Sequence, residues 1–212
     1  MITKHFWRTG ESARLPLILA LLVLATAAGG APLRLALRFD RIAIDHGQWW
    51  RFLGAHFVHL SLAHTLVNVL GLATLALLCP QRLPWTLALR RVLWLGLGIG
   101  LCLYHLAPAV TDYVGLSGVL HGLFVLGLVP PALRADRYAL AALAVLVAKL
   151  VAEHVWGAST AEGALIGGHV VTQAHLYGAV LALAYGIVFG SFGGREAARL
   201  ERAQNTSPRN ST

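Results

Sequence analysis

Apolar residues along this chain fall into long blocks that short polar segments separate. A helix needs about 20 largely apolar residues to cross the hydrocarbon core of a bilayer. Six blocks reach or approach this length, and they cover residues 15–33, 55–79, 92–107, 115–129, 138–156 and 170–189. The pattern therefore predicts an all-α integral membrane protein, built as a bundle of six transmembrane helices.

The composition supports this prediction. Of the 212 residues, 57% are hydrophobic and only 12% are charged, whereas a soluble domain carries roughly 25% charged residues. Mean hydropathy is +0.67. No polar segment outside the apolar blocks is long enough to fold alone. We therefore expect one membrane domain over residues 1–194 and a polar cytoplasmic tail over residues 195–212.

The basic residues predict how the helices are oriented. The net charge is +8, but Lys and Arg lie in short clusters between the blocks and not along one face, which argues against nucleic-acid binding. Clusters occur at the N-terminus, in the second-to-third and fourth-to-fifth connections and in the tail, while the third-to-fourth and fifth-to-sixth connections contain none. Cytoplasmic loops are rich in Lys and Arg, so we expect both termini in the cytoplasm.

The first connection, residues 34–54, departs from this rule because it carries four arginines on the expected outer side. It also holds Trp49 and Trp50, and we interpret it as an interfacial segment at headgroup level. The basic start and the small residues near 25–31 also fit a cleavable signal peptide. We favour an uncleaved first span because its apolar run is long and five spans would move the tail to the other side.

Four polar residues stand out within the predicted spans, where burial of a polar group is costly. They are His64 and Asn68 in the second span, Ser117 in the fourth and His175 in the sixth. These three spans all enter the membrane from the outer side. At ~1.5 Å per residue, His64 lies about two turns inside, Ser117 lies near its helix start, and His175 lies about one and a half turns inside. The topology thus predicts that they meet in one leaflet.

The residue types at this meeting point predict nucleophilic catalysis. A serine hydroxyl becomes a good nucleophile when a base accepts its proton, and a neutral His175 can be that base for Ser117. His64 and Asn68, spaced i, i+4, share one helix face and can donate hydrogen bonds to an oxyanion. No acidic residue is expected near these positions, so the sequence predicts a dyad and not a triad.

Each of these residues also has an ordinary structural interpretation. A serine between glycines occurs by chance in many helices, a single histidine can be a hydrogen-bonded packing residue, and a His/Asn pair can tie two spans together. The catalytic interpretation depends on their joint position at one depth on one side of the membrane.

The motifs around these residues resemble those of the rhomboid family. Residues 59–68 (HLSLAHTLVN) look like the rhomboid second-helix motif, which would make His64 and Asn68 the oxyanion-binding residues. Residues 115–118 (GLSG) resemble the nucleophile motif. The resemblance covers nearly the whole chain and implies a six-helix rhomboid bundle, with Ser117 as nucleophile.

Residues 174–178 (AHLYG) resemble the catalytic-histidine helix of the same family. The resemblance implies that His175 is the base and that Gly178 permits close contact with the serine helix. It also implies hydrolysis of a peptide bond in or next to the bilayer anchor of a membrane protein, without a cofactor. The alternative within the family is an inactive rhomboid-like protein that binds transmembrane helices without cleaving them.

The small size and the run GLSGVLHG at residues 115–122 are similar to the rhombosortase branch. Rhombosortases are bacterial rhomboids that process proteins with a C-terminal glycine-rich sorting tail. This resemblance implies a multi-pass protein of the bacterial inner membrane with an active site open to the periplasm. His121 replaces an aromatic residue that many rhomboids place against the catalytic histidine. We expect its ring either to pack on His175, or to fix the tautomer of that residue or take part in proton transfer.

Other polar residues give weaker predictions. His56, His59 and His64 lack a carboxylate or thiolate partner, so we expect no metal site and place His56 and His59 at the outer interface. Lys149 and Glu153, spaced i, i+4 in the fifth span, predict an ion pair, or a lysine that faces the gap through which a substrate helix enters. A small transporter is disfavoured because the polar residues gather in one leaflet.

Overall fold

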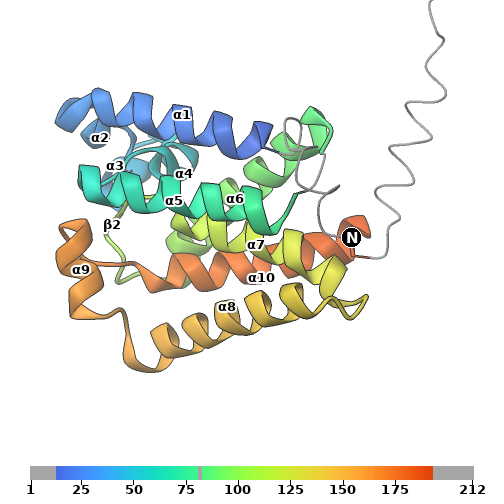
Figure 1. Ribbon diagram of the computed structural model, residues 1–212. Helices are drawn as coiled ribbons and strands as arrows, with labels where there is room; N and C mark the ends of the chain where they lie inside the picture. Colours follow the sequence, from blue (N-terminus) through green and yellow to red (C-terminus); the bar gives the residue numbers. More distant parts are fainter. Residues whose placement is uncertain (1–12, 81–82, 193–212) are drawn as a thin grey trace, which may run out of the picture.

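The computed structural model describes residues 13–80 and 83–192 as a bundle of helices with one small two-stranded sheet (Figure 1). The expected tail over residues 195–212 lies outside the described residues. The helices are α1 (Arg14–Ala28), α2 (Gly30–Leu37), α3 (Arg41–Asp45), α4 (Arg51–Gly54), α5 (Leu62–Leu78), α6 (Trp85–Leu106), α7 (Ser117–Ala132), α8 (Arg137–Trp156), α9 (Thr160–Ile166) and α10 (Thr172–Phe189), with a 3₁₀ turn at Ala55–Phe57. The strands are β1 (Phe39–Asp40) and β2 (Asp112–Tyr113).

The prediction of an all-α membrane protein is confirmed. Among the described residues, α6, α8 and α10 are long and apolar enough to cross a membrane, and the number rises to five if each of two bent helix pairs forms one span. The shorter α7 is apolar as well. A full set of six spans stays a prediction.

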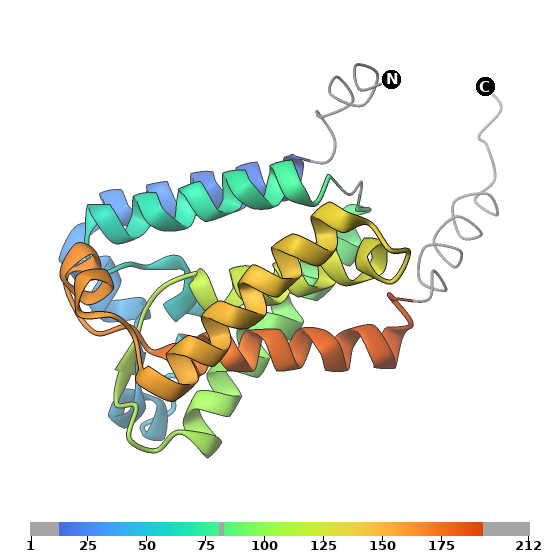
Figure 2. The ribbon, with the colours of Figure 1, turned by 60° about the horizontal axis from the view of Figure 1, so that its bottom comes forward.

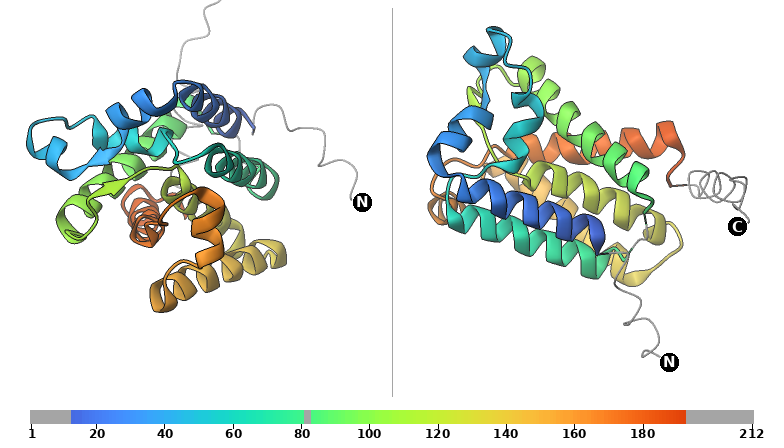
Figure 3. Two further views of the ribbon diagram at one scale, coloured as in Figure 1. Left: turned by 90° about the vertical axis from the view of Figure 1, so that its left-hand side faces the viewer. Right: turned by 90° about the horizontal axis from the view of Figure 1, so that it is seen from above.

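Helix α7 lies at the centre of the bundle. It contacts α5, α6, α8 and α10. In the end-on view of Figure 3 (left), α1 and α5 lie above the central helices and α8 lies below them. Ten of the residues of α7 are buried, from Gly118 to Leu128. A helix that is apolar on every side is typical of a bundle interior.

The first apolar block is not one straight helix. Helix α1 ends at Ala28, and α2 leaves it at an angle of 115°. The cause is the Gly29-Gly30 pair, because Gly30 has a φ of +60°, which is unfavourable for residues with a Cβ atom. The second block also divides: α5 begins only at Leu62, after Ser61 caps its first turn, and it is bent by 88° from the preceding helical segment.

Helix α6 begins at Trp85, well before the predicted start at residue 92. The predicted span left Arg90 and Arg91 outside its start. In the structure, the Arg90 guanidinium donates to the Tyr185 hydroxyl at 2.8 Å and lies over the ring of Phe189. Aromatic faces of α10 thus accommodate charged residues within α6.

The first connection is a folded layer at one end of the bundle. Strand β1 pairs antiparallel with β2, with Phe39 opposite Tyr113. Arg51 is buried and donates to the carbonyl groups of Leu35 and Arg38, both at 2.8 Å. The N–H of Gly115 donates to the Ala55 carbonyl at 2.9 Å. These bonds fix the segment that leads into α7.

Candidate active site

The structure brings Ser117 and His175 into contact. Ser117 is the first residue of α7, and His175 lies in the first turn of α10. The Ser117 Oγ and His175 Nε2 atoms are 2.8 Å apart, and the imidazole is only 3% exposed. A serine and a histidine from distant parts of the chain therefore lie within hydrogen-bond distance, as a nucleophile and its base would need to.

Small residues make this contact possible. A Cβ atom at Gly118 would lie 2.7 Å from the Ala174 carbonyl oxygen, and a Cβ atom at Gly178 would overlap the carbonyl oxygen of Gly118. The backbones of α7 and α10 therefore touch directly. The sequence-based expectation that Gly178 permits a close approach agrees with this packing.

His64 approaches the same site from α5. It lies in the first turn of this helix and not two turns inside, because α5 begins at Leu62. A Cβ atom at Gly115 would lie 2.8 Å from the His64 Nε2 atom, so the imidazole packs on the backbone just before Ser117. Gly115 has a φ of +120°, which also favours glycine.

Asn68 lies one turn deeper on the same face of α5. Its amide nitrogen donates to the His64 carbonyl at 3.0 Å. Its Oδ1 atom is buried and accepts no hydrogen bond from any described residue. The Asn68 amide is therefore tied to its own helix, and His64 is the side chain nearer to the serine loop.

Glu153 also belongs to the site. Its Oε2 atom lies 2.7 Å from His175 Nδ1, and its Oε1 atom forms an ion pair with Lys149 Nζ at 2.5 Å. The expectation that no acidic residue lies near the serine and histidine is wrong. The predicted Lys149–Glu153 pair is present, but it accounts for only one of the two carboxylate oxygens.

The two contacts of His175 assign roles to its ring nitrogens. A carboxylate only accepts hydrogen bonds, so Nδ1 carries the proton and donates it to Glu153. The Nε2 lone pair then faces the Ser117 hydroxyl, which donates to it. This is the tautomer that a general base needs.

His121 lies on α7, the helix of Ser117, and its ring stacks on that of His175. The ring centroids of His121 and His175 are 4.2 Å apart, with an interplanar angle of 14°. Its Nδ1 atom lies 2.7 Å from the Ser117 carbonyl oxygen, so that nitrogen donates within its own helix. The stacked contact that the packing interpretation of His121 predicts is therefore present, while Glu153 lies at the Nδ1 atom of His175.

His121, Glu153 and His175 are close enough for a metal to be considered, since one ligand atom from each lies within 4.8 Å of the others. Imidazole nitrogens bind a metal in the plane of the ring. The two rings are stacked almost in parallel, so their lone pairs point along separate planes and do not converge. This arrangement fits a hydrogen-bonded network and not a metal centre.

His56 and His59 lie elsewhere than expected. His56 is 1% exposed and contacts the Gly96 carbonyl oxygen at 2.9 Å. His59 is also buried, and its ring packs edge-on against His64. The expectation that they meet headgroups or water at the outer interface is wrong, because both imidazoles are buried inside the protein.

A groove of about 340 Å³ opens beside Ser117 and His175. In Figure 2, α8 runs obliquely across the front of the bundle and α5 runs along its top. The groove lies between these two helices, over α7. It is lined mostly by apolar side chains, with the polar residues His64, Asn68, Thr74, Lys149 and Glu162 among them.

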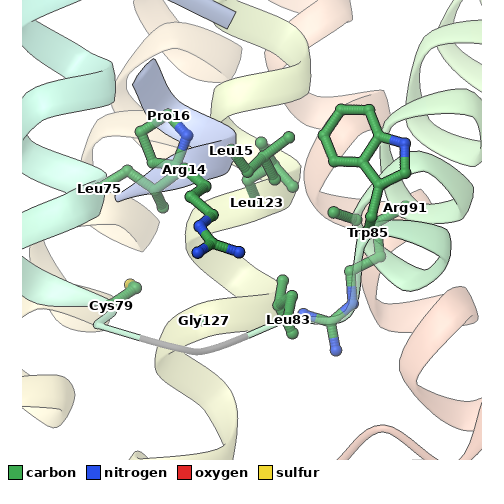
Figure 4. A pocket seen from close by; sticks show the side chains of 11 residues that line it. Arg14, Leu15, Pro16, Leu75, Cys79, Leu83, Trp85, Arg91, Leu123 and Gly127 are labelled. Carbon is green, nitrogen blue, oxygen red and sulfur yellow. The ribbon is translucent and has the colours of Figure 1, made fainter. Parts of the chain in front are cut away.

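A second, smaller cavity of about 90 Å³ lies near the other end of α7 (Figure 4). Its lining includes Arg14, Arg91 and Cys79, next to Gly127. No histidine or carboxylate is among its lining residues. Its described lining therefore offers no histidine or carboxylate base for a nucleophile.

Comparison with known families agrees with this geometry. The Rhomboid domain matches residues 46–192, which is more than half of the chain and includes all four predicted site residues. The chain belongs to the rhomboid family. Rhomboid proteins are intramembrane proteases that act on membrane-protein substrates within the bilayer. No curated protein matches the chain. Helices α1 and α2 precede the matched region.

Proposed function

We propose that this rhomboid protein is a serine endopeptidase that cleaves a peptide bond in or next to the membrane anchor of a substrate protein. The observation that carries the proposal is the 2.8 Å contact between Ser117 Oγ and His175 Nε2 beside an apolar groove. A binding protein without catalysis would have no use for a serine hydroxyl aligned on a neutral imidazole.

In this reaction the Ser117 oxygen attacks the scissile carbonyl carbon while the hydroxyl proton passes to His175 Nε2. The tetrahedral oxyanion is stabilised by N–H groups in the first turn of α7, which have no intrahelical acceptor. His64 and the amide of Asn68 are the side-chain candidates for the same role. His175 then gives its proton to the leaving amine, and water hydrolyses the acyl-enzyme by the reverse sequence.

The substrate enters the groove between α5 and α8. Apolar walls fit a transmembrane segment, and the polar end of the groove fits the point where that segment unwinds. Glycine-rich segments unwind readily because glycine is a poor helix former, which supports a rhombosortase-like substrate with a small-residue tail before its anchor. Replacement of these glycines by leucine would then prevent cleavage while leaving the reactivity of Ser117 intact.

The proposed topology has six spans, with α1, α5, α6, α7, α8 and α10 as their main helices and both termini in the cytoplasm. The catalytic end of the bundle then faces the periplasm of a bacterial inner membrane. The connections that lack Lys and Arg precede α7 and α10, which supports this orientation.

Labelling of the purified protein with a fluorophosphonate tests the catalytic proposal. We expect the wild type to be labelled, and Ser117→Ala and His175→Ala to lose labelling. His154→Ala, which replaces an exposed histidine on α8, is the matched control and should label like the wild type. Labelling of folded Ser117→Ala at the wild-type rate would refute the assignment of the nucleophile.

A further inference from the structure

We propose that Glu153 is a positioning residue that holds His175 and stabilises its protonated form, so that the site is a Glu–His–Ser relay. This inference rests on the proposed function, because it concerns the base of the same reaction. Ser117 Oγ, His175 and Glu153 Oε2 form a continuous chain with distances of 2.8 and 2.7 Å.

The path of the proton in this relay is short. When Ser117 attacks a carbonyl, its proton moves to His175 Nε2, and the ring becomes an imidazolium. Glu153 keeps its negative charge and receives no proton. It lowers the energy of the imidazolium through the Nδ1–H hydrogen bond, as the buried carboxylate of a serine-protease triad does.

The burial of Glu153 argues that the carboxylate does more than pair with Lys149. The Glu153 side chain is 6% exposed, while that of Lys149 is 41% exposed. An ion pair that only stabilised α8 could lie at the surface, where it avoids the desolvation penalty of a buried carboxylate. Lys149 also reaches Glu162 on α9 at 3.3 Å. The buried position of Glu153 is thus explained by its contact with His175 and not by its ion pair with Lys149.

The charged and titratable groups around His175 come from four helices. His121 stacks on it from α7, Glu153 and Lys149 approach from α8, and His64 and Glu162 line the same groove from α5 and α9. Glu153 is the anion in hydrogen-bond contact with the ring. Lys149 lies behind that carboxylate and opposes its effect on the imidazolium.

Two substitutions should therefore shift the pH dependence in opposite directions. Glu153→Gln keeps an amide oxygen that can accept from Nδ1–H, but it removes the charge that stabilises the imidazolium. The acidic limb of the labelling-rate profile should then move to lower pH. Lys149→Met removes the opposing cation, so the acidic limb should move to higher pH.

The experiment measures the second-order rate of fluorophosphonate labelling from acid to neutral pH in the purified full-length protein. In a serine-protease triad the carboxylate contributes up to ~10⁴-fold, so we expect Glu153→Gln to label at least about 10-fold more slowly at neutral pH. Glu153→Asp should recover part of this loss. Asp112→Asn, which changes an exposed carboxylate outside the groove, should behave like the wild type.

The outcomes separate the two proposals. Persistent labelling of Ser117→Ala would refute the proposed function itself. If Ser117→Ala is inert but Glu153→Gln labels at the wild-type rate with an unshifted acidic limb, only the relay is refuted. If Glu153→Gln does not fold, an unshifted or acid-shifted profile for folded Lys149→Met refutes the relay, and a shift to higher pH supports it.

Discussion

At the scale of single residues, the His175 ring is restrained on three sides. Ser117 meets Nε2, Glu153 meets Nδ1, and His121 covers one face of the ring. Two hydrogen bonds and one stacked ring leave the imidazole little rotational freedom. The site is therefore arranged for proton transfer before a substrate arrives.

Replacement of His121 by another aromatic residue separates a packing role of its ring from a chemical role of its imidazole. His121→Phe keeps an aromatic face against His175 but loses the hydrogen bond to the Ser117 carbonyl. Such stacked pairs contribute about 0.5–1.5 kcal/mol, so we expect fluorophosphonate labelling within about 10-fold of the wild type. His154→Phe at an exposed position is the control. A folded His121→Phe protein that does not label would show that the imidazole itself takes part.

The sequence predicted Ser117, His175, His64 and Asn68 because their spans enter the membrane from one side. It missed Glu153 for a physical reason: the i, i+4 spacing from Lys149 already explained the residue as half of an ion pair. Which neighbour a residue of α8 faces depends on the rotation of that helix, and an almost uniformly apolar helix gives no amphipathic face from which to predict it. The contact between α8 and α10 could come only from the three-dimensional structure.

At the scale of helices, the contact between α7 and α10 controls the distance between Ser117 and His175. Ala174 and Gly178 lie on one side of this contact, and Gly118 and Gly122 lie on the other. With backbones in direct contact, the Ser117 and His175 side chains reach each other although the serine side chain is short. A wider separation would leave the hydroxyl without its base.

Gly178→Ala tests this dependence without touching a reactive group. The added methyl would overlap the Gly118 carbonyl oxygen, so the helices must move apart. Overpacking of this kind costs typically about 1–3 kcal/mol. We expect a lower melting temperature in detergent and at least about 10-fold slower fluorophosphonate labelling, since hydrogen-bond alignment between base and nucleophile is lost. Val180→Leu, an enlargement at an exposed position of α10, is the control; equal behaviour of the two variants would contradict the packing argument.

Helix boundaries were the least predictable part of the fold. Each apolar block overlaps one of the main helices, but α6 extends through Arg90 and Arg91, for which α10 offers aromatic partners. The first block bends at Gly29-Gly30, and the short α9 lies in a connection for which no helix was predicted. Each difference arises from a tertiary contact or a glycine conformation that hydropathy alone does not encode.

At the scale of the whole molecule, the proposed orientation predicts where fused reporters are active. Green fluorescent protein fused after the C-terminus should fluoresce, because that end is expected in the cytoplasm. Alkaline phosphatase fused within residues 107–112 or 157–159 should be active, because those connections are expected in the periplasm. The opposite pattern at these junctions would overturn the proposed topology, and a fusion in the fourth-to-fifth connection serves as the cytoplasmic control.

Ser117, His175 and His64 all lie within the first turns of their helices, at one end of the bundle. Under the proposed mechanism and topology, the reaction is therefore limited to a thin layer on one side of the bilayer. An anchored protein inserted in the opposite sense would carry its susceptible bond to the other layer and escape cleavage, even with an unchanged amino-acid sequence. The proposed mechanism thus predicts that the depth of three side chains lets the protein discriminate between substrates by their direction of insertion as well as by their sequence.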